Sequence, residues 1–264
     1  MKRAIGLAAL TVLELPHEEQ ISVAAQAGYS HVGLRLVPVA GQPFNHPFDV
    51  AQVEKRLADT GIKVLDVEVF RLTPETKVSD FESALAAAAR LRATDLLVHG
   101  ADAVESRLIN IFGQLCDLAA RYGLAANIEP MPWVDVSNMS KAVRVLEGAR
   151  RENAGLLVDA IHFFRAGDSL DALAKVPRKF LRYTQLCDAR AERPTDMQEI
   201  IRQARSDRLF PGEGGLDLRG LMKALPAGIP ISLEVPVSQK LPPLERARRA
   251  MQATKAILGL EEGT

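Results

Sequence analysis

Short apolar runs alternate along this chain with longer segments in which apolar residues recur every three or four positions. Apolar runs are typical of strands buried on both faces, and the longer repeat is typical of amphipathic helices. The runs predict strands at 5–10, 31–37, 64–70, 95–100, 124–128, 155–158, 181–184 and 229–233. The repeats predict helices at 16–27, 50–59, 79–92, 108–122, 138–149, 169–175, 196–205, 217–225 and from 243 onward. Ser79 is the predicted N-cap of the third helix.

The order of these elements is a strand followed by a helix, repeated eight times. Alternation of this kind calls for a parallel sheet. The 264 residues give about 33 for each unit, which suits a closed eightfold barrel. No G-x-G-x-x-G motif follows the first strand, which argues against a dinucleotide-binding open sheet. We therefore predict an α/β fold with a single (β/α)8 TIM barrel domain over residues 1–264.

Four oxygen-bearing side chains stand at or near the ends of four successive predicted strands, namely Glu129, Asp159, Gln185 and Glu234. The first two intervals, 30 and 26 residues, each fit one strand–helix unit of roughly 30 residues. The third, 49 residues, fits one unit plus the Gly/Pro-rich loop at 208–218. Because working residues lie at the C-terminal mouth of such barrels, we expect these four side chains to converge there.

Three carboxylates in one cleft repel each other and raise each other's pKa unless a cation separates them. A divalent metal would do so, and oxygen ligands favour Mg²⁺ or Mn²⁺, with Co²⁺ as a further candidate and Zn²⁺ less favoured without His or Cys. We predict that Glu129, Asp159, Gln185 and Glu234 bind this metal. The alternatives are a purely ionic network and, for Asp159 alone, capping of the following turn.

Several other side chains are candidates for the mouth of the barrel. Arg71 and His99 follow or end strands, and Arg208 begins the Gly/Pro-rich loop, so we predict that these three bind substrate. Each Arg could equally make a surface salt bridge, His99 could be an ordinary hydrogen-bonded histidine, and Arg35 could face outward. His162 is the best candidate base because imidazole titrates near neutral pH; it could instead be a loop histidine bonded to backbone.

Composition limits the partners that this chain can have. Lys plus Arg and Asp plus Glu each number 33, so there is no bulk charge to attract nucleic acid or an anionic membrane. Aromatic residues make up 5%, which offers little stacking surface for bases. No apolar run is long enough for a transmembrane helix, and the N-terminus has no signal-peptide pattern. We expect a cytoplasmic protein with a small anionic or polyol substrate, and its state as a monomer or homo-oligomer stays open.

The motifs in the second half of the chain resemble those of the xylose isomerase-like TIM barrel superfamily of sugar isomerases, epimerases and dehydratases. They are Asn127-Ile-Glu-Pro, Leu157-Val-Asp-Ala-Ile-His162, Tyr183-Thr-Gln-Leu-Cys-Asp188, Phe210-Pro-Gly-Glu-Gly-Gly-Leu-Asp217 and Ile231-Ser-Leu-Glu-Val. The resemblance implies the same four metal ligands named above. Endonuclease members of the superfamily fit less well, because a cluster of His ligands and a basic face are not apparent.

Gln185 in place of a histidine, the Asp-x-x-His of the sixth strand, Phe70-Arg71 and Arg-x-Phe-Pro-Gly-x-Gly are similar to bacterial 3-dehydroshikimate dehydratases. This resemblance implies a metal-dependent lyase that removes water from a cyclic hydroxy-keto acid, with His162 as base and Arg71 holding a carboxylate. The alternative is a sugar or sugar-phosphate isomerase or epimerase in which Glu129 and Glu234 act as acid and base. A non-catalytic sugar-binding barrel is a third class, which the intact carboxylate set disfavours.

One departure from the resemblance concerns the second strand. Family members commonly carry an acidic residue there, whereas this chain has Val32-Gly33-Leu34-Arg35. The substrate therefore stays open, and Arg35 could add an anion contact.

Overall fold

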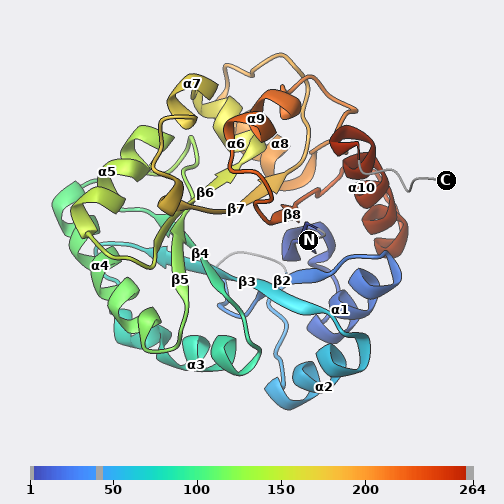
Figure 1. Cartoon of the computed structure of the whole chain (residues 1–264), viewed down its shortest axis with the longest axis horizontal. Helices are drawn as coiled ribbons and strands as arrows, with labels where there is room; N and C mark the ends of the chain where they lie inside the picture. Colours follow the sequence, from blue (N-terminus) through green and yellow to red (C-terminus); the bar gives the residue numbers. More distant parts are fainter. Residues whose placement is uncertain (1–2, 40–43, 260–264) are drawn as a thin grey trace.

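The computed structural model describes residues 3–39 and 44–259. In this part of the chain eight parallel strands pair in sequence order and the last pairs with the first, so that the sheet closes into a barrel (Figure 1). The strands are β1 (Ile5–Leu7), β2 (His31–Arg35), β3 (Lys63–Leu72), β4 (Asp95–Gly100), β5 (Ala125–Ile128), β6 (Ala154–Asp159), β7 (Leu181–Leu186) and β8 (Ile231–Leu233). The predicted (β/α)8 barrel is confirmed.

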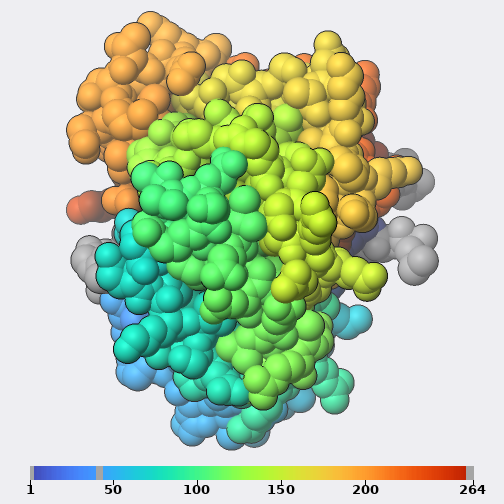
Figure 2. Space-filling view, turned by 90° about the vertical axis from the view of Figure 1, so that its left-hand side faces the viewer, coloured from blue at the N-terminus to red at the C-terminus, as the bar shows by residue number. Residues whose placement is uncertain are grey.

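Helices surround the barrel (Figure 1). They are α1 (His17–Gln26), α2 (Val50–Thr60), α3 (Glu82–Arg90), α4 (Glu105–Ala120), α5 (Met139–Ala149), α6 (Ala160–Ala166), α7 (Leu170–Leu173), α8 (Met197–Ser206), α9 (Leu218–Ala224) and α10 (Pro243–Leu258). Their apolar stripes pack on the outer face of the strands in one large core. Figure 2 shows the outer surface of this layer of helices, where the green segments of α4 and α5 lie side by side. None of the helices described is long and apolar enough to cross a membrane.

The first predicted strand is shorter than expected. β1 ends at Leu7, and Ala9–Val12 form a 3-10 turn. The Thr11 hydroxyl donates to the Leu233 carbonyl oxygen at 2.8 Å and accepts from the Val235 N–H at 2.8 Å. These bonds join the turn to the end of β8, which explains why an apolar run is diverted from the strand direction.

The predicted N-cap at Ser79 is wrong. Val78–Phe81 form a separate 3-10 turn, and α3 begins at Glu82 with Phe81 in the cap position and no side-chain cap. The Phe81 ring packs edge-on against Phe70 of β3, with ring centroids 5.1 Å apart. This packing fixes where the helix begins, because burial of an aromatic pair outweighs a local capping preference.

The inside of the barrel holds a second, smaller apolar cluster. Its members are Leu65, Val69, Leu97, Leu157 and Tyr183. The Tyr183 hydroxyl donates to Asp66 Oδ2 at 3.2 Å, so this cluster also encloses a buried carboxyl group.

Gly33 on β2 makes room for that carboxyl group. A Cβ at position 33 would lie 2.5 Å from Asp66 Oδ1, closer than any real carbon–oxygen contact.

Candidate active site

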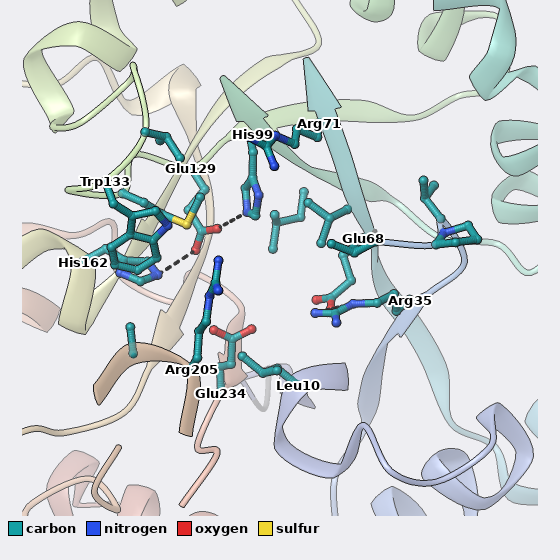
Figure 3. Close-up of a pocket in the computed structure, with 18 of the residues that line it drawn as sticks. Leu10, Arg35, Glu68, Arg71, His99, Glu129, Trp133, His162, Arg205 and Glu234 are labelled. Carbon is teal, nitrogen blue, oxygen red and sulfur yellow. Dashed lines mark hydrogen bonds and ion pairs between the residues drawn. The ribbon is translucent and has the colours of Figure 1, made fainter. Parts of the chain in front are cut away.

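A cavity of about 480 Å³ opens at the C-terminal ends of the strands. Its lining side chains come from the ends of β2, β3 and β4, from the loops after β5 and β8, and from α6 and α8 (Figure 3). The register of β3 against β4 shifts between Val67 and Phe70, where Glu68 and Val69 both line the cavity. The cavity lies where (β/α)8 barrels hold their working residues.

The four side chains that the sequence singled out form what we call the floor: Glu129 and Glu234 line the cavity, and Asp159 and Gln185 lie next to them. Glu129 follows β5, Asp159 ends β6, Gln185 lies in β7 and Glu234 follows β8, and all four are buried. Glu129, Asp159 and His162 each offer a donor atom within 4.8 Å of the other two. Gln185 Nε2 donates to Glu234 Oε1 at 3.1 Å, which joins the other two side chains of the set.

Arg208 connects the two halves of this floor. Its Nη1 lies 2.6 Å from Asp159 Oδ2 and its Nη2 lies 2.6 Å from Glu234 Oε2, with both partners buried. Its Nε donates to the Ala204 carbonyl oxygen at 2.7 Å. Arg208 was predicted to bind substrate; the structure places its guanidinium between two acids of the floor, and the substrate contact stays a prediction.

Asp159 performs two tasks at once. Its Oδ1 accepts from the His162 backbone N–H at 3.2 Å and so caps α6, while Oδ2 pairs with Arg208. Burial alone would oppose its charge, but the Arg208 guanidinium and His162 hold the pKa of Asp159 below its usual value. The capping alternative and the binding alternative are therefore compatible in one side chain.

The donor atoms of the floor fit a divalent metal. Glu129 Oε1, Gln185 Oε1 and His162 Nδ1 are buried and have no hydrogen-bond partner among the described residues. Burial and the negative charge of Asp159 raise the pKa of Glu129, and burial also raises that of Glu234. Carboxylates in this state need a further positive charge to stay ionised. Carboxylate oxygens, an amide oxygen and an imidazole suit Mg²⁺, Mn²⁺, Co²⁺ or Zn²⁺.

His162 lies beside the floor, in the first turn of α6. Its Nε2 is 3.8 Å from Glu129 Oε1, and the Trp133 ring covers it edge-on with centroids 5.0 Å apart. Burial lowers the pKa of His162 to about 3, so the ring is neutral at neutral pH. A neutral imidazole next to a carboxylate can accept a proton and have its new charge stabilised.

His99 faces Glu129 from β4. Its Nε2 lies 2.8 Å from Glu129 Oε2, as the dashed line in Figure 3 marks. Burial, together with nearby guanidinium groups and against the charge of Glu68, lowers the pKa of His99 to about 3. A neutral ring that carries its proton on Nε2 donates to the carboxylate and orients it. His99 was predicted to bind substrate, and it lines the cavity as that role requires.

Three further guanidinium groups line the cavity. Arg35 points into the cavity rather than outward, and its Nη2 lies 2.7 Å from Glu68 Oε1 (Figure 3). Arg71, the predicted carboxylate holder, lines the cavity, as does Arg205 of α8. In the part of the chain that the structure describes, neither guanidinium has a hydrogen bond or an ion pair.

Sequence reasoning missed three residues of this cavity. Glu68 carried a signal, because it is one of two acids in an otherwise apolar strand. Trp133, the single tryptophan of the chain, lies four residues after Glu129 and could have been noted. Arg205 carried none, because an arginine near a helix end is typical of a solvated surface.

Comparison with known proteins places this geometry in a family. A sequence profile described as "Xylose isomerase-like TIM barrel" matches residues 21–257. The chain belongs to this family. It is 28% identical over 155 residues to a 3-dehydroshikimate dehydratase of Pseudomonas aeruginosa, a match that covers 57% of this chain and 24% of the relative. A 3-dehydroshikimate dehydratase of Pseudomonas putida is 25% identical over 283 residues, which cover all of this chain and 42% of the relative.

This chain is also similar to isomerases. An inosose isomerase of Bacillus subtilis is 25% identical over 124 residues, 46% of this chain and 42% of the relative. The chain thus covers less than half of the length of each of these curated relatives. A solved structure described as IolI protein with a bound zinc atom matches this chain with a TM-score of 0.80 at 17% identity. The match covers 99% of this chain and 100% of that structure's chain. That likeness concerns the fold.

Proposed function

We propose that this protein is a divalent-metal-dependent dehydratase that acts on a cyclic hydroxy-keto acid such as 3-dehydroshikimate. The observation that carries the proposal is that the cavity combines a neutral His162 beside the acidic floor with an Arg71 guanidinium that has no hydrogen bond or ion pair among the residues described. A keto acid needs a base near its α C–H and a cation for its carboxylate, and a neutral polyol needs no such cation. Two curated relatives with dehydratase names support the proposal.

The chemistry assigns one task to each group. A divalent metal in the floor would polarise the substrate carbonyl and so make the neighbouring C–H more acidic. His162 takes that proton and returns it to the departing β-hydroxyl, which leaves as water. One proton of the ring CH2 group then moves to the carbonyl oxygen, which gives the aromatic dihydroxy acid. Arg71 holds the carboxylate in a bidentate contact, and Trp133 keeps water from the imidazole that accepts the proton.

The first test is absorbance of an aromatic product. Protein is stripped with a chelator, resupplied with Mg²⁺, Mn²⁺, Co²⁺ or Zn²⁺, and given 3-dehydroshikimate. We expect a metal-dependent rise in protocatechuate absorbance. No rise in protein that calorimetry shows to bind a metal would overturn the dehydratase assignment. A panel of ketoses and inososes would then test the isomerase and epimerase alternative.

The base is tested by His162→Ala. Loss of a general base lowers kcat by about 10²–10⁴-fold, so we expect such a fall with the metal still bound. Metal content of the purified variant separates the two roles open to His162, because a ligand role predicts that metal is lost together with turnover. Turnover within a few-fold of the parent would exclude His162 as the base.

A further inference from the structure

Two of the four guanidinium groups that line the cavity are paired, and two are not. Arg208 neutralises Asp159 and Glu234, and Arg35 neutralises Glu68. Arg71 and Arg205 have no acidic partner among the residues described. A substrate with one carboxylate would give Arg71 an anionic partner but would leave Arg205 without one.

Arg205 enters the cavity from the side opposite Arg71. Figure 3 shows Arg205 rising past Glu234 toward the space in front of Glu129 and His162, while Arg71 lies at the far edge beyond His99. Both side chains line the cavity, Arg71 from the end of β3 and Arg205 from the end of α8. A ligand in the cavity is therefore bracketed by two cations.

The segment that carries Arg205 is held firmly. The buried Arg165 of α6 donates to Gln203 Oε1 at 3.1 Å, and Arg202 lies 2.8 Å from Asp207 Oδ2. Arg208 Nε is bonded to the Ala204 carbonyl oxygen, one residue before Arg205. An exposed arginine in the last turn of a helix commonly serves the helix dipole alone. Here the backbone on both sides is fixed, so the point from which the exposed Arg205 side chain enters the cavity is fixed as well.

We propose that Arg205 is a specificity-determining residue that binds a second negative charge of the substrate, with the first, the carboxylate, on Arg71. In the proposed dehydration, on which this inference rests, that second charge develops on the carbonyl oxygen as His162 removes the neighbouring proton. Cations placed where charge develops act more strongly on the transition state than on the ground state. The site thus favours small cyclic ligands with two anionic groups over those with one.

Stable ligands test this without turnover. Benzoate carries one carboxylate, and benzene-1,3-dicarboxylate carries a second in the ring position that corresponds to the substrate ketone. Calorimetry on metal-loaded protein compares both. We expect the dicarboxylate to bind the parent more tightly, and Arg205→Gln to weaken it about 10- to 100-fold, the range of a hydrogen bond to a charged group. Benzoate affinity should change little in Arg205→Gln and fall in Arg71→Gln.

Two further variants sharpen the test. Arg219→Gln removes an exposed charge of α9 outside the cavity and should leave both affinities unchanged, whereas Arg205→Lys keeps the charge and should retain part of the preference. A parent protein without preference for the dicarboxylate, or equal losses for both ligands in Arg205→Gln, would overturn the proposal. Thermal unfolding of each variant checks that it is folded.

Kinetics give an independent readout and separate this inference from the proposed function. With 3-dehydroshikimate, Arg205→Gln should lower kcat with little change in KM, and Arg71→Gln should mainly raise KM. If the parent does not dehydrate the substrate but keeps the ligand preference, the proposed function fails and the role of Arg205 stands. If the parent dehydrates it and Arg205→Gln changes neither kcat nor ligand preference, the role of Arg205 fails alone.

Discussion

Two layers of buried acids lie one above the other in this barrel, and they differ in their partners. In the floor of the cavity, Asp159 and Glu234 share the guanidinium of Arg208. Deeper in the barrel, the Tyr183 hydroxyl is the one hydrogen-bond donor to the Asp66 side chain among the residues described. Burial together with the charges of Glu68 and Asp95 raises the pKa of Asp66 well above the usual value.

The difference shows that burial alone does not decide the charge of a carboxyl group. The Arg208 guanidinium holds the pKa of Asp159 below its usual value and opposes the effect of burial on Glu234. A hydroxyl cannot do this, so the lower acid stays in its neutral form over a wider range of pH. The upper layer suits ligand chemistry, and the lower layer fills space.

The largest effect should follow from removing the cation of the upper layer. Arg208→Met leaves Asp159 and Glu234 facing each other unpaired, and breaking a buried ion pair from one side costs about 3–5 kcal/mol of unfolding free energy. Urea unfolding in the presence of a chelator measures this loss. Added Mn²⁺ should restore part of it, because a bound cation stabilises the folded state.

The matched control for Arg208 is an exposed ion pair. Arg144 Nη2 lies 2.8 Å from Glu105 Oε2, and both side chains are about half exposed. Arg144→Met should therefore lower the unfolding free energy far less than Arg208→Met does, because an exposed ion pair is screened by solvent. Equal losses in the two variants would contradict the view that Arg208 is essential to the floor.

The lower layer is tested by filling the space that Asp66 occupies. In Gly33→Ala the new methyl group would meet Asp66 Oδ1 at 2.5 Å and Cγ at 3.3 Å, and overpacking of this kind costs about 1–3 kcal/mol. Chemical denaturation measures the loss. In the background of Asp66→Ala the same substitution should cost less, and an undiminished cost would show that the carboxyl group is not the obstacle.

The contrast between the two layers also predicts a pH dependence from Asp66. Its folded-state pKa lies above its unfolded value, so its favourable contribution is complete below the unfolded pKa and is lost as the pH rises through the folded value. Asp66→Asn removes this titration. We expect the variant to gain stability relative to the parent as the pH rises from about 4, by about 1.4 kcal/mol for each unit by which the pKa is raised.

The test of Asp66→Asn is how the difference in unfolding free energy between variant and parent changes with pH, not the absolute stability of either protein. Denaturation curves of parent and variant at several pH values give the difference in unfolding free energy. A difference that does not change with pH would mean that Asp66 has an ordinary pKa, and the contrast between the two layers would then disappear.

The sequence by itself determined the order of the elements and the positions of the acids at the strand ends. Apolar runs and helical repeats depend on neighbouring residues, and the carboxyl ends of parallel strands must meet at one edge. The sequence alone was therefore enough to predict that four side chains lie close together, namely Glu129, Asp159, Gln185 and Glu234.

Only the tertiary structure decided which cation serves which acid. The sequence around Arg35, Arg205 and Arg208 does not show which acid each of them contacts. In the structure Arg35 pairs with Glu68 and Arg208 pairs with acids of the floor, whereas Arg205 enters the cavity. The reason is that a long side chain can reach several partners, and the choice among them depends on elements distant in the sequence. The contact between Gly33 and Asp66 likewise depends on the tertiary structure, because the two residues are brought together only by the pairing of β2 with β3.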